Sequence, residues 1–152
     1  MTTALHISIT PKAETLVQVM SANQKRRIGI FGGTFNPIHQ GHLVVANQAL
    51  QQLELDEIWF MPNNIPPHKR VKQMATNQQR VEMLQRAIYN NPRFKIELIE
   101  LERGGISYTF ETMQQLKYLC PDDDFYLIIG GDEVRDLKNW FMIDELKKLV
   151  TF

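Results

Sequence analysis

The amino-acid sequence predicts an α/β domain in which helices flank a mostly parallel central sheet. Short apolar stretches alternate along the chain with segments whose apolar residues recur at helical spacing, and the connections between them are short. This alternation is typical of a parallel sheet, because every strand needs a crossover to return to the same edge. A continuous apolar run at 125–129 has the character of a strand covered on both faces, which favours the same class.

The individual elements follow from Arg27 onward. Apolar and alternating stretches predict strands at 28–31, 56–61, 94–99 and 125–129, and the start of a further strand at 149–152. Helical spacing of apolar residues predicts helices at 43–53, 76–88, 107–119 and 143–148. Thr76 is the expected N-cap of the second helix, because its hydroxyl can accept a backbone N–H of the first turn.

Length and composition limit the classes of protein that fit. The 152 residues suit one domain, which we place at 26–152, and residues 1–25 look like an N-terminal extension. The 17 basic residues equal the 17 acidic ones, which argues against a general nucleic-acid or membrane-surface binder. No apolar run approaches the roughly 20 residues of a membrane span, and the opening residues do not resemble a secretory signal. We therefore expect a cytoplasmic protein.

The strongest local feature is the segment 32–43, between the first predicted strand and the first helix. Its two glycines, Gly32 and Gly33, let a phosphate approach the backbone, and the helix start supplies N–H groups and a positive dipole end. His39 and His42 are three residues apart, so both imidazoles can face one point near that helix start. Ligands of parallel sheets bind at the carboxyl ends of the strands, which places the expected site here.

Two other interpretations of His39 and His42 exist. The segment could be an ordinary helix-entry turn with two incidental imidazoles, although a pair of histidines in a glycine-bounded turn favours function. The H-x-x-H spacing could also chelate zinc, but His68 alone would be a poor completion of the ligand set. The chain contains neither a G-x-G-x-x-G pattern nor a G-x-x-x-x-G-K-[ST] loop, so the commonest dinucleotide and triphosphate signatures do not apply.

The segment 32–43 resembles the signature of the H-x-G-H nucleotidyltransferase superfamily. Four further motifs resemble those of the bacterial nicotinate mononucleotide adenylyltransferases, in that family's order: Pro66-Pro-His-Lys, Arg80-Val-Glu-Met-Leu, Ser107-Tyr-Thr, and Gly130-Gly-Asp ahead of Trp140. The resemblance implies a Rossmann-like nucleotidyltransferase domain. It also implies transfer of the AMP moiety of ATP to nicotinate mononucleotide, which gives nicotinate adenine dinucleotide (deamido-NAD) and pyrophosphate in NAD biosynthesis.

The same resemblance implies roles for individual residues. His39 and His42 would be catalytic, contacting the triphosphate and stabilising the transition state. The residues implied to bind ATP and its phosphates are Gly32, Gly33, Thr34, Phe35, Gly41, Lys69, Gly130 and Asp132. The residues implied to bind the nicotinate nucleotide are Tyr108, Thr109, Trp140 and Phe141. Mg²⁺ would accompany ATP as the cofactor, and no metal site formed by protein side chains is implied.

Some of these residues keep a structural alternative. Trp140 could belong to the core, and Asp132 could be a helix N-cap as well as a ribose ligand. Lys69 could be a solvated loop lysine, although we favour a phosphate contact. Arg80 begins a helix and could equally be a surface residue that pairs with Glu82, so we do not predict a catalytic role for it.

The expected partners are ATP and nicotinate mononucleotide, with neither nucleic acid nor a membrane, and a homo-oligomer is compatible with the sequence. The family pattern continues with a Ser/Thr-rich phosphate-binding segment that does not occur before Phe152. We therefore expect the domain at 26–152 to be truncated at its C-terminal end. The alternatives are an adenylyltransferase for nicotinamide mononucleotide or a phosphopantetheine-type acceptor, and a non-catalytic nucleotide-binding remnant.

Overall fold

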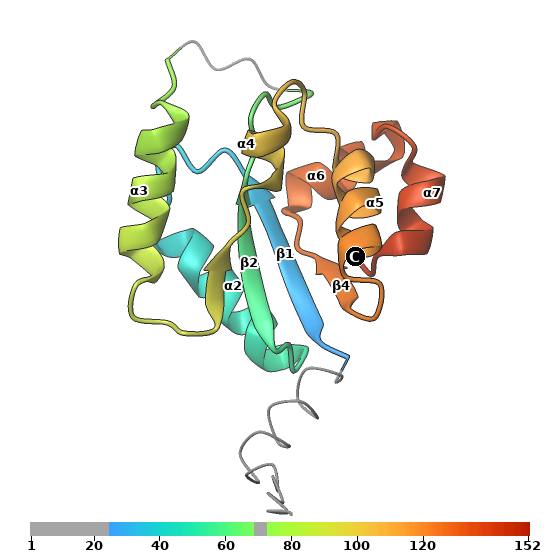
Figure 1. Cartoon of the computed structure of the whole chain (residues 1–152), viewed down its shortest axis with the longest axis horizontal. Coiled ribbons are helices and arrows are strands. Elements are labelled where there is room, and N and C mark those ends of the chain that lie inside the picture. The colour runs from blue at the N-terminus through green and yellow to red at the C-terminus, as the bar shows by residue number, and fades with distance from the viewer. Residues whose placement is uncertain (1–24, 69–72) are drawn as a thin grey trace, which may run out of the picture.

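The computed structural model describes residues 25–68 and 73–152. Its centre is a four-stranded sheet with the order β3-β2-β1-β4, in which all neighbouring strands are parallel. The strands are β1 (Arg27–Gly33), β2 (Glu57–Pro62), β3 (Phe94–Ile96) and β4 (Asp124–Leu127). Helices cover both faces of the sheet (Figure 1), which confirms the predicted α/β class.

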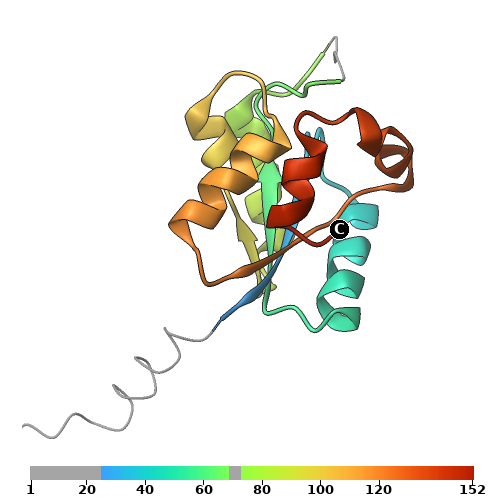
Figure 2. The same ribbon diagram turned by 90° about the vertical axis from the view of Figure 1, so that its right-hand side faces the viewer.

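The helices form two layers around the sheet. They are α2 (Gln40–Gln52), α3 (Asn77–Ile88), α4 (Ile99–Arg103), α5 (Thr109–Leu119), α6 (Gly131–Asp136), the 3₁₀ helix η1 (Leu137–Asn139) and α7 (Ile143–Leu149). α2 and α3 share one buried apolar cluster with β2 and β3, whereas α5 and α7 share another with β1 and β4. The view turned by 90° shows α2 and α5 on opposite sides of the sheet (Figure 2).

The central strand β1 separates the two apolar clusters. Ile28 and Ile30 are fully buried on the side of α5, and the intervening Gly29 faces the other layer. A Cβ on Gly29 would lie 2.6 Å from Cδ1 of Ile58 and 2.9 Å from Cδ1 of Leu55, so a larger residue would require the ends of these two side chains to shift. The alternation of faces along the strand thus positions both helix layers.

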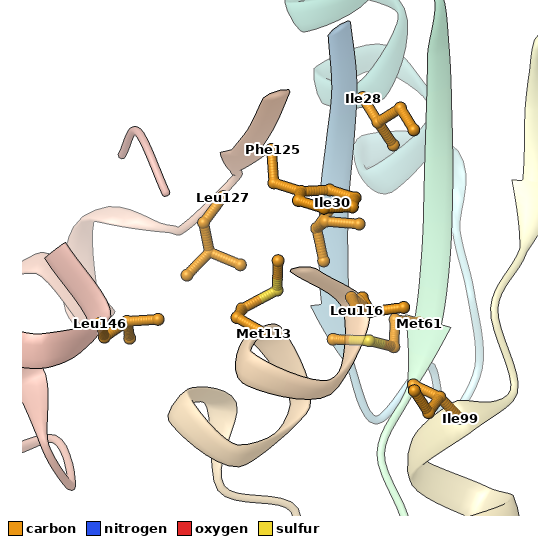
Figure 3. Packing of buried hydrophobic residues seen from close by; sticks show 9 residues of the cluster. All are labelled: Ile28, Ile30, Met61, Ile99, Met113, Leu116, Phe125, Leu127 and Leu146. Atoms are coloured by element: carbon orange, nitrogen blue, oxygen red, sulfur yellow. The ribbon is translucent and has the colours of Figure 1, made fainter. Parts of the chain in front are cut away.

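The cluster on the α5 side ties distant parts of the chain together (Figure 3). In this view, Met113 of α5 points toward Ile30 of β1 and toward Phe125 and Leu127 of β4. Leu146 of α7 is fully buried in the same cluster. Each such buried side chain stabilises the fold by about 1.5–3 kcal/mol, so this layer holds the C-terminal half of the site in place.

The helix start at Thr76 is confirmed. Its hydroxyl accepts the N–H of Gln79 at 3.2 Å, and the Gln79 side chain accepts the N–H of Thr76 at 3.0 Å. These two bonds form a capping box, which satisfies backbone donors that a helix start otherwise leaves unpaired.

Several predicted strands have different bounds in the structure, and the one expected at 125–129 ends at Leu127. The strand expected at 94–99 stops at Ile96, because the Glu97 carboxylate accepts the N–H of Ile99 at 2.9 Å and the chain turns into α4. The strand expected from Leu149 is wrong at its first residue, which still belongs to α7. Only Thr151 forms a parallel bridge there, to Tyr126.

No helix within 25–68 and 73–152 is long and apolar enough to cross a membrane. The predicted N-terminal extension lies outside the described residues apart from Lys25, which is 3.2 Å from the Asp124 carboxylate.

Candidate active site

A cavity of about 230 Å³ opens at the carboxyl ends of β1, β2 and β4. One wall is the turn after β1, and a second is the loop after β2. The start of α5, the helix α6 and the segment after η1 close the remaining sides. Its place in the fold is the one expected of a ligand site in a parallel sheet, where the strand ends and their loops converge.

The last two residues of β1 and the residue that follows bring three of the implied phosphate-binding residues to the cavity: Gly32, Gly33 and Thr34. A Cβ on Gly33 would lie 3.2 Å from the ring of Phe35, so a larger residue would push against this ring. The Gly33 carbonyl accepts the N–H of Asn63 at 2.9 Å, and Oγ1 of Thr34 accepts Nδ2 of Asn63 at 3.2 Å. The turn is therefore fastened to the loop after β2.

Other residues implied to bind ATP lie elsewhere. Phe35 is 3% exposed and belongs to the apolar cluster of α2 and α3, so its ring does not line the cavity. Gly41 is in the first turn of α2, and Gly130 is the N-cap of α6; neither lines the cavity. Lys69 lies outside the described residues, whereas the neighbouring His68 lines the cavity.

His39 and His42 lie together at the start of α2, and neither belongs to the cavity lining. Their rings stack with centroids 3.7 Å apart. The backbone N–H of His39 donates to Nδ1 of His42 at 3.1 Å, which assigns the proton of a neutral His42 ring to Nε2. The edges of Phe31 and Phe35 contact His42 from the core side, with ring centroids 5.8 and 5.1 Å away.

The surroundings of His42 favour its neutral form. Burial lowers the pKa of His42, and the neighbouring His39 lowers it further because two imidazolium charges repel. A neutral His42 can donate its Nε2–H to a phosphate oxygen. Because the ring carries no charge, this contact does not require the desolvation of an imidazolium ion. In the described part of the chain, no group of three or more His, Cys, Asp or Glu side chains is arranged to hold a metal ion.

All four residues implied to bind the nicotinate nucleotide line the cavity: Tyr108, Thr109, Trp140 and Phe141. The rings of Tyr108 and Phe141 lie 4.9 Å apart, and Thr109 is the first residue of α5. Trp140 is half-buried and also packs against the core cluster of α5 and α7. The core interpretation and the cavity interpretation of Trp140 therefore both apply.

The helix α6 contributes an acidic wall. Asp132 lines the cavity from the second position of the helix, and the N-cap is Gly130, so the expectation that Asp132 caps this helix is wrong. Glu133 and Asp136 line the cavity as well, although the sequence did not single them out. The Glu133 carboxylate accepts the N–H of Gly130 at 2.8 Å. Positions 132, 133 and 136 lie on one side of α6. The sequence predicted no helix here, and such a prediction would have indicated that these three acidic residues lie close together.

Glu100 is a cavity residue that sequence reasoning missed. Its side chain is 4% exposed, and Oγ1 of Thr112 donates to its carboxylate at 2.8 Å. Burial raises the pKa of Glu100, against the opposing effect of hydrogen bonds from Thr112 and Ser107. The alternating stretch before it predicted a strand, so no signal placed this carboxyl group at the site.

Arg80 is completely buried, which excludes the alternative of a surface residue that pairs with a neighbour such as Glu82. It lies one turn into α3, whose first residue is Asn77. The guanidinium donates to the carbonyl of Thr34 at 2.8 Å, to the carbonyl of Asn63 at 2.7 Å and to Oδ1 of Asn77 at 2.6 Å, rather than pairing with Glu82. The burial of Arg80 could not be predicted from the sequence, because it depends on where the ends of β1 and β2 lie in the fold.

A family model described as cytidylyltransferase-like matches residues 30–152. A probable nicotinate-nucleotide adenylyltransferase of Geobacillus thermodenitrificans is 56% identical over 126 residues, which cover 83% of this chain and 58% of the relative. The nicotinate-nucleotide adenylyltransferase of Bacillus subtilis is 54% identical over 127 residues, which cover 84% of this chain and 67% of the relative. The chain thus spans 58% of the length of the Geobacillus relative.

Solved structures show the same fold. A putative nicotinate-nucleotide adenylyltransferase of Vibrio parahaemolyticus superposes with a TM-score of 0.70 at 19% identity, covering 83% of this chain and 71% of that chain. The nicotinic acid mononucleotide adenylyltransferase of Plasmodium falciparum, complexed with NaAD, superposes with a TM-score of 0.66 at 26% identity. That match covers 80% of this chain and 60% of the Plasmodium chain.

Proposed function

The chain belongs to the nicotinate-nucleotide adenylyltransferases, within the cytidylyltransferase-like family, and we propose on this basis that it has their activity. The protein transfers the AMP moiety of ATP to nicotinate mononucleotide and forms nicotinate adenine dinucleotide and pyrophosphate. The structure of the Plasmodium falciparum relative in complex with NaAD supports a dinucleotide product of this class.

One observation carries the proposal beyond family membership. A single cavity is lined both by the glycine turn Gly32–Thr34 and by the aromatic residues Tyr108, Trp140 and Phe141. A glycine turn at a strand end accommodates phosphate groups, and aromatic faces stack on a pyridine ring. Both ends of a mononucleotide with a planar base thus have complementary surroundings in one cavity.

The reaction needs alignment more than proton transfer. A phosphate oxygen of nicotinate mononucleotide attacks the α-phosphorus of ATP and forms a new P–O bond. The bond from this phosphorus to the oxygen that bridges to the β-phosphate breaks, and its electron pair leaves with pyrophosphate. The attacking phosphate is anionic at neutral pH, so no general base is required, and catalysis consists of positioning and charge stabilisation.

The residues at the start of α2 supply that stabilisation in this proposal. The first turn of a helix presents backbone N–H groups, and His42 adds its Nε2–H as a side-chain donor. His39 stacks on His42 and orients it. These donors act on the charge that develops on the phosphates as the pyrophosphate bond lengthens.

We propose Mg²⁺ as the cofactor. The described side chains form no metal site of their own, so the metal would arrive with the triphosphate, and a single carboxylate of the α6 wall, such as Asp132, could add a ligand beside the phosphate oxygens. Mg²⁺ typically binds through one or two carboxylates together with substrate phosphates and water. When bound, it would neutralise charge on the phosphates and so assist departure of pyrophosphate.

The test is a pyrophosphate-release assay with ATP, Mg²⁺ and either nicotinate mononucleotide or nicotinamide mononucleotide. Pyrophosphate release with the acid, and formation of the dinucleotide, is the expected result. Absence of turnover with both mononucleotides would reject the activity. A preference for the amide would reassign the substrate to nicotinamide mononucleotide.

A further inference from the structure

We propose that Arg80 is a positioning residue, whose buried guanidinium holds together the loops that form the walls of the cavity. What the cavity binds rests on the proposed function, whereas the contacts of Arg80 do not depend on it. Arg80 itself is not part of the cavity lining.

The first step of the argument is the pair of carbonyl groups that Arg80 joins. Nη1 donates to the carbonyl of Thr34 at 2.8 Å, and Nη2 donates to the carbonyl of Asn63 at 2.7 Å. Thr34 follows β1, Asn63 follows β2, and both line the cavity. The planar fork of a guanidinium can span two such acceptors with fixed geometry, which an ammonium group cannot.

The second step is a chain of hydrogen bonds that extends from Arg80 to the opposite wall. Nη2 also donates to Oδ1 of Asn77 at 2.6 Å, and Nδ2 of Asn77 donates to Oδ1 of Asn64 at 3.0 Å. The N–H of Asn64 donates to Oγ of Ser107 at 2.9 Å. Ser107 lines the cavity directly before Tyr108, so one buried group is connected to both the turn after β1 and the aromatic side.

The third step is the energetic cost of this arrangement. Arg80 is 0% exposed, and burial lowers its pKa, an effect that no acidic neighbour within residues 25–68 and 73–152 offsets. A buried charge is costly unless hydrogen bonds satisfy it. Here the oxygens of Thr34, Asn63 and Asn77 accept from the two Nη atoms, whereas the buried Nε has no partner among the described residues. An apolar side chain would fill the same space without this cost. The benefit must therefore lie in the loops that the guanidinium fixes.

Amide hydrogen exchange tests the contact independently of activity. The reporters are the N–H of Asn63, bound to the Gly33 carbonyl, and the N–H of Asn64, bound to Ser107. Arg80→Lys keeps the charge but cannot span both carbonyls. We expect both reporter amides to exchange at least roughly tenfold faster than in the unchanged protein, as for loss of one hydrogen bond.

Two comparisons make this result decisive. The N–H of Ile58, in the strand core, should keep its protection, because the change is local. Arg86→Lys makes the same substitution at an exposed position of the same helix and should leave both reporters unchanged. Equal acceleration of Ile58, or no difference between the two arginine variants, would overturn the proposal.

A second variant covers the case in which Arg80→Lys does not fold. Asn77→Ala removes an exposed side chain and breaks the chain of hydrogen bonds between Arg80 and Asn64. The Asn64 amide should then exchange faster while the Asn63 amide keeps its rate. Unchanged exchange at Asn64 would contradict the proposed connection.

The kinetic test concerns the effect on the site. We expect Arg80→Lys to lower kcat by roughly tenfold and also to raise KM for both substrates, because displaced walls align the reacting groups less well. Fewer folded molecules alone would lower kcat without changing KM, and this outcome would overturn the positioning role. If the unchanged protein shows no adenylyl transfer at all, the proposed function fails, and the exchange experiment still judges Arg80.

Discussion

Nδ1 of His42 accepts the backbone N–H of His39 at 3.1 Å, and the two imidazole rings stack with centroids 3.7 Å apart. The hydrogen bond fixes the direction of the His42 ring and leaves Nε2–H as its donor. Burial and the adjacent His39 lower the pKa of His42, so this donor belongs to a neutral ring near neutral pH. The start of α2 therefore presents a fixed side-chain donor next to its backbone N–H groups.

Replacing His42 by alanine should reduce turnover with little effect on the fold. We expect kcat to fall by about 10²–10³-fold, the usual effect of removing one donor that stabilises charge in a transition state. Pyrophosphate release measures the rate, and circular dichroism and the melting temperature check the fold. Gln48→Ala, at an exposed position of the same helix, is the matched control. A His42→Ala variant with the rate of Gln48→Ala would remove His42 from the mechanism.

Glu100 should make the protein less stable as the pH rises. Burial raises the pKa of Glu100 in the folded state above its ordinary value of 4.5, so the folded state binds more protons than the unfolded state in this range. The free energy of unfolding therefore falls from about pH 4.5 upward, until the folded-state pKa is passed. Below this window Glu100 is protonated in both states and contributes no slope.

The variant Glu100→Gln tests this contribution. It should flatten the decrease in the free energy of unfolding across that window, measured by urea denaturation at several pH values. Glu97, whose pKa burial also raises, retains its share of the slope. Glu82→Gln, at an exposed position, should leave the slope as it is. A slope in Glu100→Gln equal to that of the unchanged protein would show that Glu100 does not titrate in this way.

Asp123 should be a major electrostatic contributor to stability. Its side chain is 9% exposed and accepts three hydrogen bonds from Arg26: from the backbone N–H, from Nε and from Nη2. Asp123→Asn removes the charge and the oxygen that accepts from Nη2, and leaves one neutral amide oxygen as acceptor, so it should lower the free energy of unfolding by about 2–3 kcal/mol. Asp122→Asn, at the exposed neighbouring position, is the control and should change stability by less than about 0.5 kcal/mol. Equal effects of the two substitutions in urea denaturation would refute this role.

Trp140 should contribute to binding of the pyridine ring. We expect Trp140→Ala to weaken nicotinate mononucleotide binding by roughly tenfold, the equivalent of one aromatic stacking contact, and Trp140→Phe to retain part of the affinity. Isothermal titration calorimetry measures both variants. Binding of ATP alone serves as the internal control and should stay within about twofold, because Trp140 belongs to the aromatic part of the lining and not to the glycine turn that binds phosphates in this proposal. A parallel loss of ATP affinity would point to general disruption of the core.

The regular elements could be predicted where their signals are local. Thr76 marks a helix start through hydrogen bonds to residues three positions away. The alternation at 94–99 predicted a strand that is too long. The Glu97 carboxylate accepts the N–H of Ile99, and the chain leaves the sheet after Ile96. A short strand followed by a short helix has no distinct period, so the acid at position 100 could not be assigned to the cavity.

The sequence by itself determined the α/β class, the glycine and histidine turn at 32–43 and the family, because periodicity and motif order are properties of the chain alone. Only the tertiary structure decided that Glu100 joins the cavity and that Phe35 lies in the core. It also decided that Arg80 is buried between Thr34 and Asn63. Burial and hydrogen bonding at these positions depend on where the ends of separate strands meet, and no local pattern encodes that meeting point.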